Sequence, residues 1–370
     1  MSEPVIVPLA RPSIDRRDRE NVRAVLESGQ LVQGSRVAAL EAAVAATVGV
    51  DHAVAVSSGT ATLHLALLSF GTGPGDEVIV PAFSHVATAN AVELTGAKPV
   101  FVDVDPGSFN IQPDGMARAI SGRTKVLMPV HEFGFPADMG KILEIAESHR
   151  LPVVEDAACA LGSQWSGRKV GSFGAAGSFS LHPRKAVTSG EGGVLATNDS
   201  GRASFFRIMR NHGMDDSGQT PDFVQAGFNY RMTDIQAALV LGQIERLETL
   251  IARRRAVAER YDRELRGRFF RKPPFPATGR TNWQSYHIVL DDTVDQTEFL
   301  AFLREKGIGA NYGAQCIPMQ TYYRRKYGYD AGDFPEAYRA FRRGVVLPLF
   351  DSMTERQATH VIESVNGYRS

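Results

Sequence analysis

Short apolar runs alternate with segments of helical spacing along most of the chain between residues 53 and 198. This alternation is typical of an α/β domain around a largely parallel sheet, because each parallel strand needs a crossover helix before the next one. The last two runs are separated by only about a dozen residues, too few for a crossover helix, so the parallel pattern breaks there. We predict seven strands at 53–57, 77–81, 99–104, 125–130, 152–156, 177–181 and 193–198, with helices at 60–70, 86–95, 114–120 and 139–149.

A different pattern begins after the last of these strands. Apolar residues at helical spacing run from 233 to 265 and predict one long helix, of the kind that links two domains. A smaller α+β pattern follows, with a strand predicted at 286–290 and helices at 296–306 and 355–366. Because 370 residues exceed what one core usually organises, we predict a large domain over residues 1–250 and a small one over 251–370.

Charge and composition disfavour several classes of partner. Lys plus Arg and Asp plus Glu both number 41, so the formal net charge is zero and no global field attracts nucleic acid or an anionic membrane. The two cysteines, Cys159 and Cys316, provide neither a disulfide framework nor paired metal-ligand spacing, which indicates a reducing compartment and no metal site. The N-terminal segment lacks the pattern of a signal peptide, and no apolar run is long enough to span a bilayer. We therefore expect a cytoplasmic protein.

Lys185 stands in surroundings unlike those of an ordinary surface lysine. The sequence from Ser178 to Gly193 reads S-F-S-L-H-P-R-K-A-V-T-S-G-E-G-G, so an apolar strand-like run precedes the lysine and a glycine-rich turn follows it. Most lysines only make a surface soluble, whereas this context suits a lysine that acts as a nucleophile.

Two further sites are predicted at strand ends that would meet near Lys185. The string S-S-G-T at 57–60 ends the first strand and opens the first helix, where unpaired backbone N–H groups can hold a phosphate. Asp156 ends the fifth strand, and ligands of open α/β sheets lie outside the carboxyl ends of strands. Each has an ordinary alternative, an unliganded N-cap for the first and a helix cap or salt bridge for Asp156. Together, a lysine, an acid and a phosphate cup are what pyridoxal phosphate requires.

Longer strings carry a family resemblance that covers nearly the whole chain. They are S-S-G-T-A-T-L-H-L-A-L (57–67), G-P-G-D-E-V-I-V-P (73–81), G-A-K-P-V-F-V-D-V-D (96–105), V-V-E-D-A (153–157), G-S-F-S-L-H-P-R-K (177–185), G-E-G-G (190–193) and N-Y-R-M-T-D-I-Q-A-A (229–238). They resemble the DegT/DnrJ/StrS family of pyridoxal-phosphate sugar aminotransferases. The resemblance implies a type I aminotransferase fold, with a large domain around a seven-stranded, mostly parallel sheet and a small C-terminal α+β domain. It also implies a homodimer whose active sites lie at the interface.

The same resemblance implies a role for eight residues. Lys185 is expected to form the Schiff base and to move the proton, and Asp156 to pair with the pyridine nitrogen. The others are expected to hold the phosphate (Gly59, Thr60 and Ser180), to lie over the cofactor face (His85), to lie beside its phenolic oxygen (Cys159), and to reach the phosphate from the neighbouring subunit (Asn229).

Two of these residues depart from the family pattern. Cys159 stands where the family usually has Gln or His, so a strong donor to the phenolic oxygen is replaced by a weak one. A buried cysteine also commonly serves as a small apolar residue. His85 stands where Phe, Tyr or Trp is more usual, which gives a smaller and titratable platform.

Three other segments are weaker candidates. We expect His182 to pack in the core rather than face the cofactor, and His131 with Gly134 to line the substrate pocket. The string from Tyr322 to Tyr327, Y-Y-R-R-K-Y, is expected to form a solvated helix face with aromatic anchors rather than to contact a nucleotide diphosphate.

The predicted reaction is a two-stage transamination. The family implies that glutamate gives its amino group to the cofactor, leaving pyridoxamine phosphate, which then aminates a keto sugar linked to a nucleotide diphosphate. A dehydratase is disfavoured because that branch of the family has histidine in place of Lys185. An aromatic amino-acid synthase or a cyclitol aminotransferase of antibiotic synthesis stays open. So does a non-catalytic regulatory relative, for which Cys159 and His85 are the only motivation.

Overall fold

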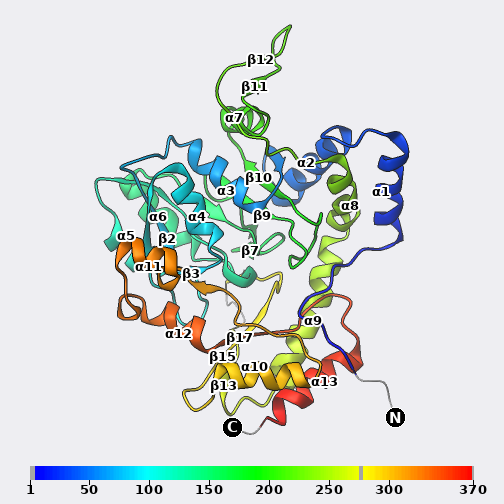
Figure 1. Ribbon diagram of the computed structural model, residues 1–370, viewed down its shortest axis with the longest axis vertical. Helices are drawn as coiled ribbons and strands as arrows, with labels where there is room; N and C mark the ends of the chain where they lie inside the picture. Colours follow the sequence, from blue (N-terminus) through cyan, green and yellow to red (C-terminus); the bar gives the residue numbers. More distant parts are fainter. Residues whose placement is uncertain (1–4, 275–277, 369–370) are drawn as a thin grey trace.

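A computed structural model describes residues 5–274 and 278–368, and its centre is a sheet of seven strands (Figure 1). Every strand coincides with a predicted one to within two residues at either end, except that the fourth stops three residues earlier. In chain order they are β1 (His52–Val56), β2 (Glu77–Pro81), β4 (Lys98–Val102), β5 (Thr124–Leu127), β6 (Val154–Asp156), β9 (Ala176–Ser180) and β10 (Gly193–Thr197).

Two ladders join to make this sheet. One has the order β4-β2-β5 and the other β6-β9-β10-β1. Parallel bridges from Leu127 to Val153 and from Val130 to Asp156 connect β5 to β6. β10 is antiparallel to both of its neighbours, which is where the short connection broke the predicted pattern. The carboxyl ends of the other six strands therefore lie at one edge of the sheet.

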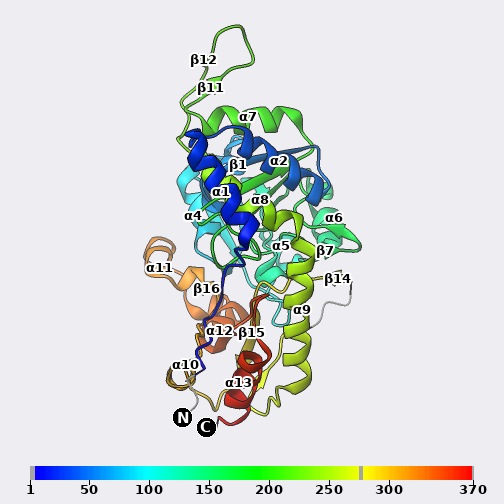
Figure 2. The ribbon, with the colours of Figure 1, turned by 90° about the vertical axis from the view of Figure 1, so that its right-hand side faces the viewer.

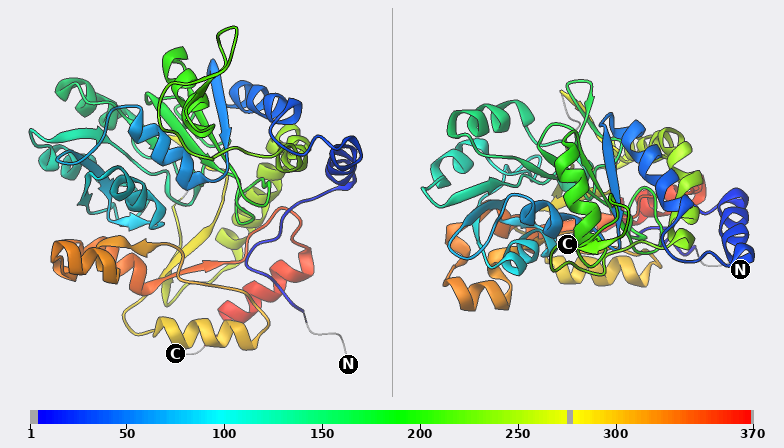
Figure 3. Two further views of the ribbon diagram at one scale, coloured as in Figure 1. Left: turned by 45° about the horizontal axis from the view of Figure 1, so that its top comes forward. Right: turned by 90° about the horizontal axis from the view of Figure 1, so that it is seen from above.

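Alternating side chains explain why helices cover both faces of the sheet. Val54 and Val56 of β1 belong to a core shared with α3, whereas Ala53 and Ala55 belong to a core shared with α2 and α8. A strand covered on both faces is apolar throughout, which is why the runs were visible in the sequence. The helices around the sheet are α2 (Ser35–Val48), α3 (Gly59–Leu68), α4 (Ala87–Thr95), α5 (Pro113–Ala119), α6 (Met139–His149) and α7 (Ser200–Arg210), while α1 (Arg16–Ser28) lies at one end of the molecule (Figure 3).

The predicted single helix over 233–265 is wrong. Two helices, α8 (Asp234–Glu245) and α9 (Leu247–Glu264), meet at Arg246, whose φ of −107° and ψ of 15° interrupt the helical path. The guanidinium of Arg246 binds the carboxylate of the buried Asp18 in α1, a contact that the local pattern does not reveal. α9 then runs from the sheet to the C-terminal part of the molecule (Figure 2).

The C-terminal part contains an antiparallel sheet with the order β13-β15-β17. Its strands are β13 (Phe270–Arg271), β15 (Tyr286–Leu290) and β17 (Gly344–Leu347), and its helices are α10 (Gln296–Glu305), α11 (Thr321–Tyr327), α12 (Pro335–Arg343) and α13 (Glu355–Asn366). The proposed domain boundary near residue 250 falls within α9, and Val7 forms a parallel bridge with Ile308. The two parts are also joined by β3 (Phe83–Ser84), which pairs with β16 (Gln315–Cys316).

A hairpin projects from the top of the molecule (Figures 1 and 2). It is formed by β11 (Met214–Asp215) and β12 (Asp222–Phe223), and exposes the apolar side chains of Phe223 and Val224. Across residues 5–274 and 278–368, no helix is both long enough and apolar enough to pass through a bilayer. Part of the N-terminal segment on which the signal-peptide prediction rests, residues 1–4, lies outside the described residues.

Candidate active site

One pocket of about 330 Å³ lies where the parallel strands end. Asn229 does not line it; this residue is exposed at the base of the projecting hairpin, where it pairs with Asn211. The other seven predicted residues meet in this pocket, although they follow four different strands: Gly59, Thr60, His85, Asp156, Cys159, Ser180 and Lys185.

Asp156 is the last residue of β6 and is 3 % exposed. The Thr88 hydroxyl donates to its Oδ2 at 2.8 Å, and the Ala158 backbone N–H donates to its Oδ1 at 3.2 Å. Thr88 also lies 2.9 Å from the Ser84 hydroxyl. These contacts hold the carboxylate at the pocket wall, where it can pair with a protonated ring nitrogen.

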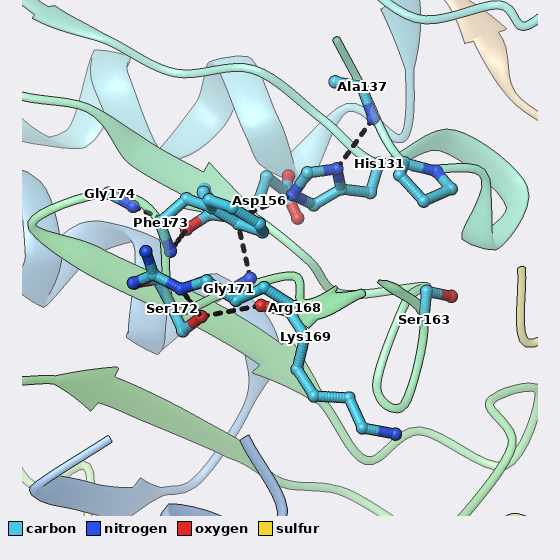
Figure 4. Close-up of polar contacts among 12 residues, drawn as sticks. His131, Ala137, Asp156, Ser163, Arg168, Lys169, Gly171, Ser172, Phe173 and Gly174 are labelled. Atoms are coloured by element: carbon cyan, nitrogen blue, oxygen red, sulfur yellow. Dashed lines mark hydrogen bonds and ion pairs between the residues drawn. The ribbon is translucent and has the colours of Figure 1, made fainter. Parts of the chain in front are cut away.

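Glu155, one residue earlier in β6, points to the opposite face of the sheet. Three backbone N–H groups of the segment 171–174 donate to its carboxylate at 2.6–2.7 Å, and His131 Nε2 lies 3.0 Å from it. His131 accepts the Ala137 N–H at Nδ1 (Figure 4), so its Nε2 carries the proton that goes to Glu155. The prediction that His131 lines the pocket is wrong, because this carboxylate holds the ring in the core at 0 % exposure.

The N-terminus of α3 lies at the place predicted for the phosphate cup. Ser58 caps the helix by accepting the Ala61 N–H at 3.1 Å. The backbone N–H groups of Gly59 and Thr60 have no acceptor anywhere in the described part of the chain. A Cβ on Gly59 would stand 2.8 Å from the Ser180 Cβ, so the glycine lets the cup approach β9 closely and brings the Ser180 hydroxyl to its rim.

Lys185 lies in the connection between β9 and β10, which backbone bonds close at its base. Leu181 N–H donates to the Gly192 carbonyl at 2.9 Å, and Ser189 N–H donates to the Leu181 carbonyl at 3.0 Å. Within this closed loop, Lys185 Nζ donates to Cys159 Sγ at 2.9 Å. Burial raises the pKa of the Cys159 thiol, so the sulfur is a neutral acceptor and not a thiolate that would hold the amine in an ion pair.

Two histidines, His85 and His182, line the wall of the pocket. The prediction that His182 packs in the core is wrong: β9 ends at Ser180, and a turn closed by the bond from Lys185 N–H to the His182 carbonyl redirects the chain. Desolvation lowers the pKa of His182 and of His85, so both rings are neutral at neutral pH. His85 therefore offers an uncharged ring at the predicted stacking position.

Three charged pocket residues were not predicted from the sequence: Glu132, Arg184 and Glu191. Glu132 follows β5 and is 4 % exposed; burial raises its pKa to about 8, while the Lys185 cation opposes that shift. Arg184 is half-buried, and its guanidinium has no partner within the part of the chain that the structure describes. The strand-end rule that identified Asp156 would also have identified Glu132 in the string P-V-H-E-F-G.

These residues fit pyridoxal phosphate. The amine of Lys185 is at hand, Asp156 offers a fixed carboxylate, and the unpaired N–H groups of α3 suit a phosphate. The model of the DegT/DnrJ/EryC1/StrS aminotransferase family matches residues 12–366. The chain belongs to this family. It is therefore a pyridoxal-phosphate-dependent aminotransferase with the type I fold.

Individual members of the family are similar over almost their whole length. The spore coat polysaccharide biosynthesis protein SpsC of Bacillus subtilis is 37% identical over 97% of this chain and 96% of its own length. The putative sugar aminotransferase Spr1654 of Streptococcus pneumoniae, in its PMP form, superposes with a TM-score of 0.93 at 28% identity, covering 98% and 97% of the two chains. PseC of Helicobacter pylori, an aminotransferase involved in the biosynthesis of pseudoaminic acid, superposes with a TM-score of 0.93 at 27% identity and covers 98% of both chains.

The basic and aromatic string of this aminotransferase packs against the large part of the fold. In α11, Tyr322 and Tyr327 donate their hydroxyls to the carboxylate of Glu93 in α4, and Lys326 forms an ion pair with it. Tyr323 is buried, whereas Tyr322 stays largely exposed. This is the helix face with aromatic anchors that the sequence favoured over a nucleotide-diphosphate contact.

Proposed function

We propose that this protein transfers an amino group from L-glutamate to a keto sugar linked to a nucleotide diphosphate, in amino-sugar biosynthesis. The meeting of Lys185, Asp156 and the α3 cup in one pocket carries the proposal. The names of relatives support its sugar component, since SpsC acts in the biosynthesis of a spore coat polysaccharide and PseC in that of pseudoaminic acid.

Each pocket residue has a distinct task in this proposal. Lys185 holds the cofactor covalently through Nζ and, once released, takes the α-proton of the donor at that nitrogen. Asp156 keeps the ring nitrogen protonated, because Thr88 and Ala158 fix its carboxylate. The N–H groups of α3 and the Ser180 hydroxyl bind the phosphate, and His85 lies over the ring. When bound, the cofactor supplies a conjugated ring that accepts the electron pair left on the α-carbon.

Arg184 is assigned to the amino-acid donor. Its guanidinium lines the pocket one residue before Lys185 and has no carboxylate partner among the residues described. A planar guanidinium binds a carboxylate through two parallel hydrogen bonds, which suits the α-carboxylate of glutamate.

A purified sample loaded with pyridoxal phosphate tests the reaction. We expect glutamate to shift its visible absorption and to yield 2-oxoglutarate, and a keto-sugar nucleotide then to be aminated and to restore the first spectrum. A panel of 3-keto and 4-keto sugar nucleotides, with a keto-cyclitol alongside, identifies the acceptor. Amination of the cyclitol alone would replace the sugar assignment, and a protein that binds the cofactor yet never responds to glutamate would contradict an aminotransferase role.

The site is also proposed to be shared between two subunits of a homodimer. Asn229 lies outside the pocket of its own chain, at the base of a hairpin whose Phe223 and Val224 are exposed. These features suit a hairpin that crosses to a partner and brings Asn229 to the partner's phosphate cup.

Subunit mixing tests this arrangement. Lys185→Ala and Asn229→Ala are expected to be weak or inactive alone, but to regain activity when co-expressed, because each mixed dimer then keeps one site with both residues intact. If the mixture gains nothing although purification on two different affinity tags recovers mixed dimers, Asn229 does not act across subunits.

A further inference from the structure

Glu132 is a pocket residue to which the proposed function assigns no task. It begins the 3₁₀ turn η1 (Glu132–Gly134), directly beyond β5. The turn has a defined conformation: Phe133 adopts a φ of 54°, and its ring stacks on His287 with 4.6 Å between ring centroids. The Glu132 backbone N–H donates to Asn110 Oδ1 at 2.9 Å. The backbone therefore holds this carboxyl group at one place on the pocket wall.

The η1 turn lies against the segment that carries Cys159. A Cβ on Gly134 would stand 3.2 Å from the Cys159 carbonyl oxygen, and the Asn282 amide donates to the same oxygen at 3.0 Å. Glu132 is also close enough to Cys159 for its ionised form to raise the pKa of the thiol. Glu132 and Cys159 thus approach the pocket from the same side.

The surroundings of Glu132 favour a group that donates a hydrogen bond. The titratable groups that face it are Lys185, which lowers its pKa, Asp156, which raises it, and the thiol of Cys159. The Ser84 hydroxyl and the Phe133 N–H are its hydrogen-bond partners, and both lower its pKa. Burial is the largest effect and raises the pKa to about 8. At neutral pH the group is mostly an uncharged acid, and its O–H can donate where a carboxylate could only accept.

We propose that Glu132 donates the hydrogen bond to the cofactor's phenolic oxygen that the weak donor Cys159 leaves unmade. This rests on the proposed binding of pyridoxal phosphate in this pocket, with its ring nitrogen on Asp156. In the family pattern the donor stands in the segment after β6, whereas in this chain it stands beyond the end of the adjacent strand β5. Glu132 is a cofactor-binding residue in this assignment, and it tunes the ring without taking part in proton transfer at the α-carbon.

Cofactor affinity separates this role from a structural one. Glu132→Leu removes the donor and is expected to weaken pyridoxal phosphate binding to the apoprotein by about tenfold or more, as for a lost hydrogen bond to a charged oxygen. Glu132→Gln keeps an N–H donor and is expected to stay within about threefold of the unmodified protein. Glu144→Leu, on an exposed part of α6, makes the same chemical change away from the pocket and serves as the control.

A rescue variant keeps the test decisive if Glu132→Leu folds poorly. Adding Cys159→Gln restores a donor on the same side of the pocket, and the double variant is expected to recover most of the lost affinity. An infrared difference spectrum between the unmodified apoprotein and the Glu132→Gln apoprotein tests the protonation of Glu132 without the cofactor. The unmodified protein should show a carboxylic-acid carbonyl band at pH 7 that Glu132→Gln lacks.

Several results would overturn the assignment. They are unchanged affinity in Glu132→Leu, an equal loss in Glu132→Gln, no rescue by Cys159→Gln, or a Glu132 that is already ionised at pH 7. Failure of the proposed function looks different, because the unmodified protein would then take up no pyridoxal phosphate on Lys185.

Discussion

Glu155 and Glu132 are both buried glutamates at the ends of neighbouring strands, but their hydrogen-bond donors differ. Three backbone N–H groups and His131 converge on Glu155, which holds together the segment behind the sheet. Glu132 has the Ser84 hydroxyl and a backbone N–H of its own turn, and burial there raises its pKa. Burial alone therefore does not say what a carboxyl group is for. A group saturated by backbone donors serves the fold, and one short of donors is available to a ligand.

The largest effect is a loss of activity, expected when the pocket residue Lys185 is replaced. Lys185→Ala should lower transamination at least ~10³-fold, because both the covalent attachment and the proton carrier are removed. The midpoint of thermal unfolding of the apoprotein should stay within about 3 °C, since among the described residues the Lys185 side chain forms a hydrogen bond only with a thiol. Lys141→Ala on α6 is the control. A large loss of thermal stability in Lys185→Ala would show that this lysine, like Glu155, stabilises the fold.

The next largest effect is a loss of folding stability, expected when Glu155 is replaced. Glu155→Leu leaves three N–H groups and His131 without their acceptor and should lower the free energy of unfolding by about 3–5 kcal/mol. Urea unfolding followed by circular dichroism measures it, with the exposed Glu144→Leu as the matched change. An unfolding curve that coincides with that of the unmodified protein would show that the saturated network contributes nothing to the fold.

The pH dependence of stability tests the raised pKa of Glu132 directly. Because the folded pKa of Glu132, about 8, exceeds its usual 4.5, the stability it contributes is complete below pH 4.5. That contribution is lost as the pH rises to about 8, by at most about 1.4 kcal/mol per pH unit. Glu132→Gln removes this loss, so the variant should gain on the unmodified apoprotein as the pH rises from about 5 to about 8. Parallel curves in urea unfolding over that range would contradict the raised pKa.

The smallest effect is expected on the binding of the amino-acid donor. Arg184→Gln should raise the KM for glutamate about tenfold, with little change in kcat at saturation or in cofactor affinity. The exposed Arg253→Gln on α9 is the control. A fall in kcat with unchanged KM would remove Arg184 from donor binding, because the guanidinium would then act only in the transition state.

The parts of the fold that were predicted from sequence are those set by local burial. Strand β2 was visible because both of its faces are covered, and Asp156 because it ends such a strand. The break at Arg246 escaped because it depends on Asp18, a distant residue in the sequence.

The errors in the site have the same origin. His131 could not be placed because its ring is drawn away from the pocket by Glu155, on the neighbouring strand. The sequence indicates that Glu132 lies beyond a strand end, but its fixed place on the pocket wall depends on the stacking of Phe133 on His287, a residue far along the chain. Positions of charged side chains beyond a strand end follow from such long-range partners, which periodicity does not report.

The pairing of β1 with β10 has a consequence for how the protein folds during its synthesis. β1 and the α3 cup leave the ribosome early, yet His52 pairs with Thr197, and the cup rests against Ser180. At ordinary elongation rates an interval on the order of ten seconds separates the two strands. During that time β1 has no partner strand, and the residues proposed to hold the phosphate cannot come together until β9 and β10 have been synthesised.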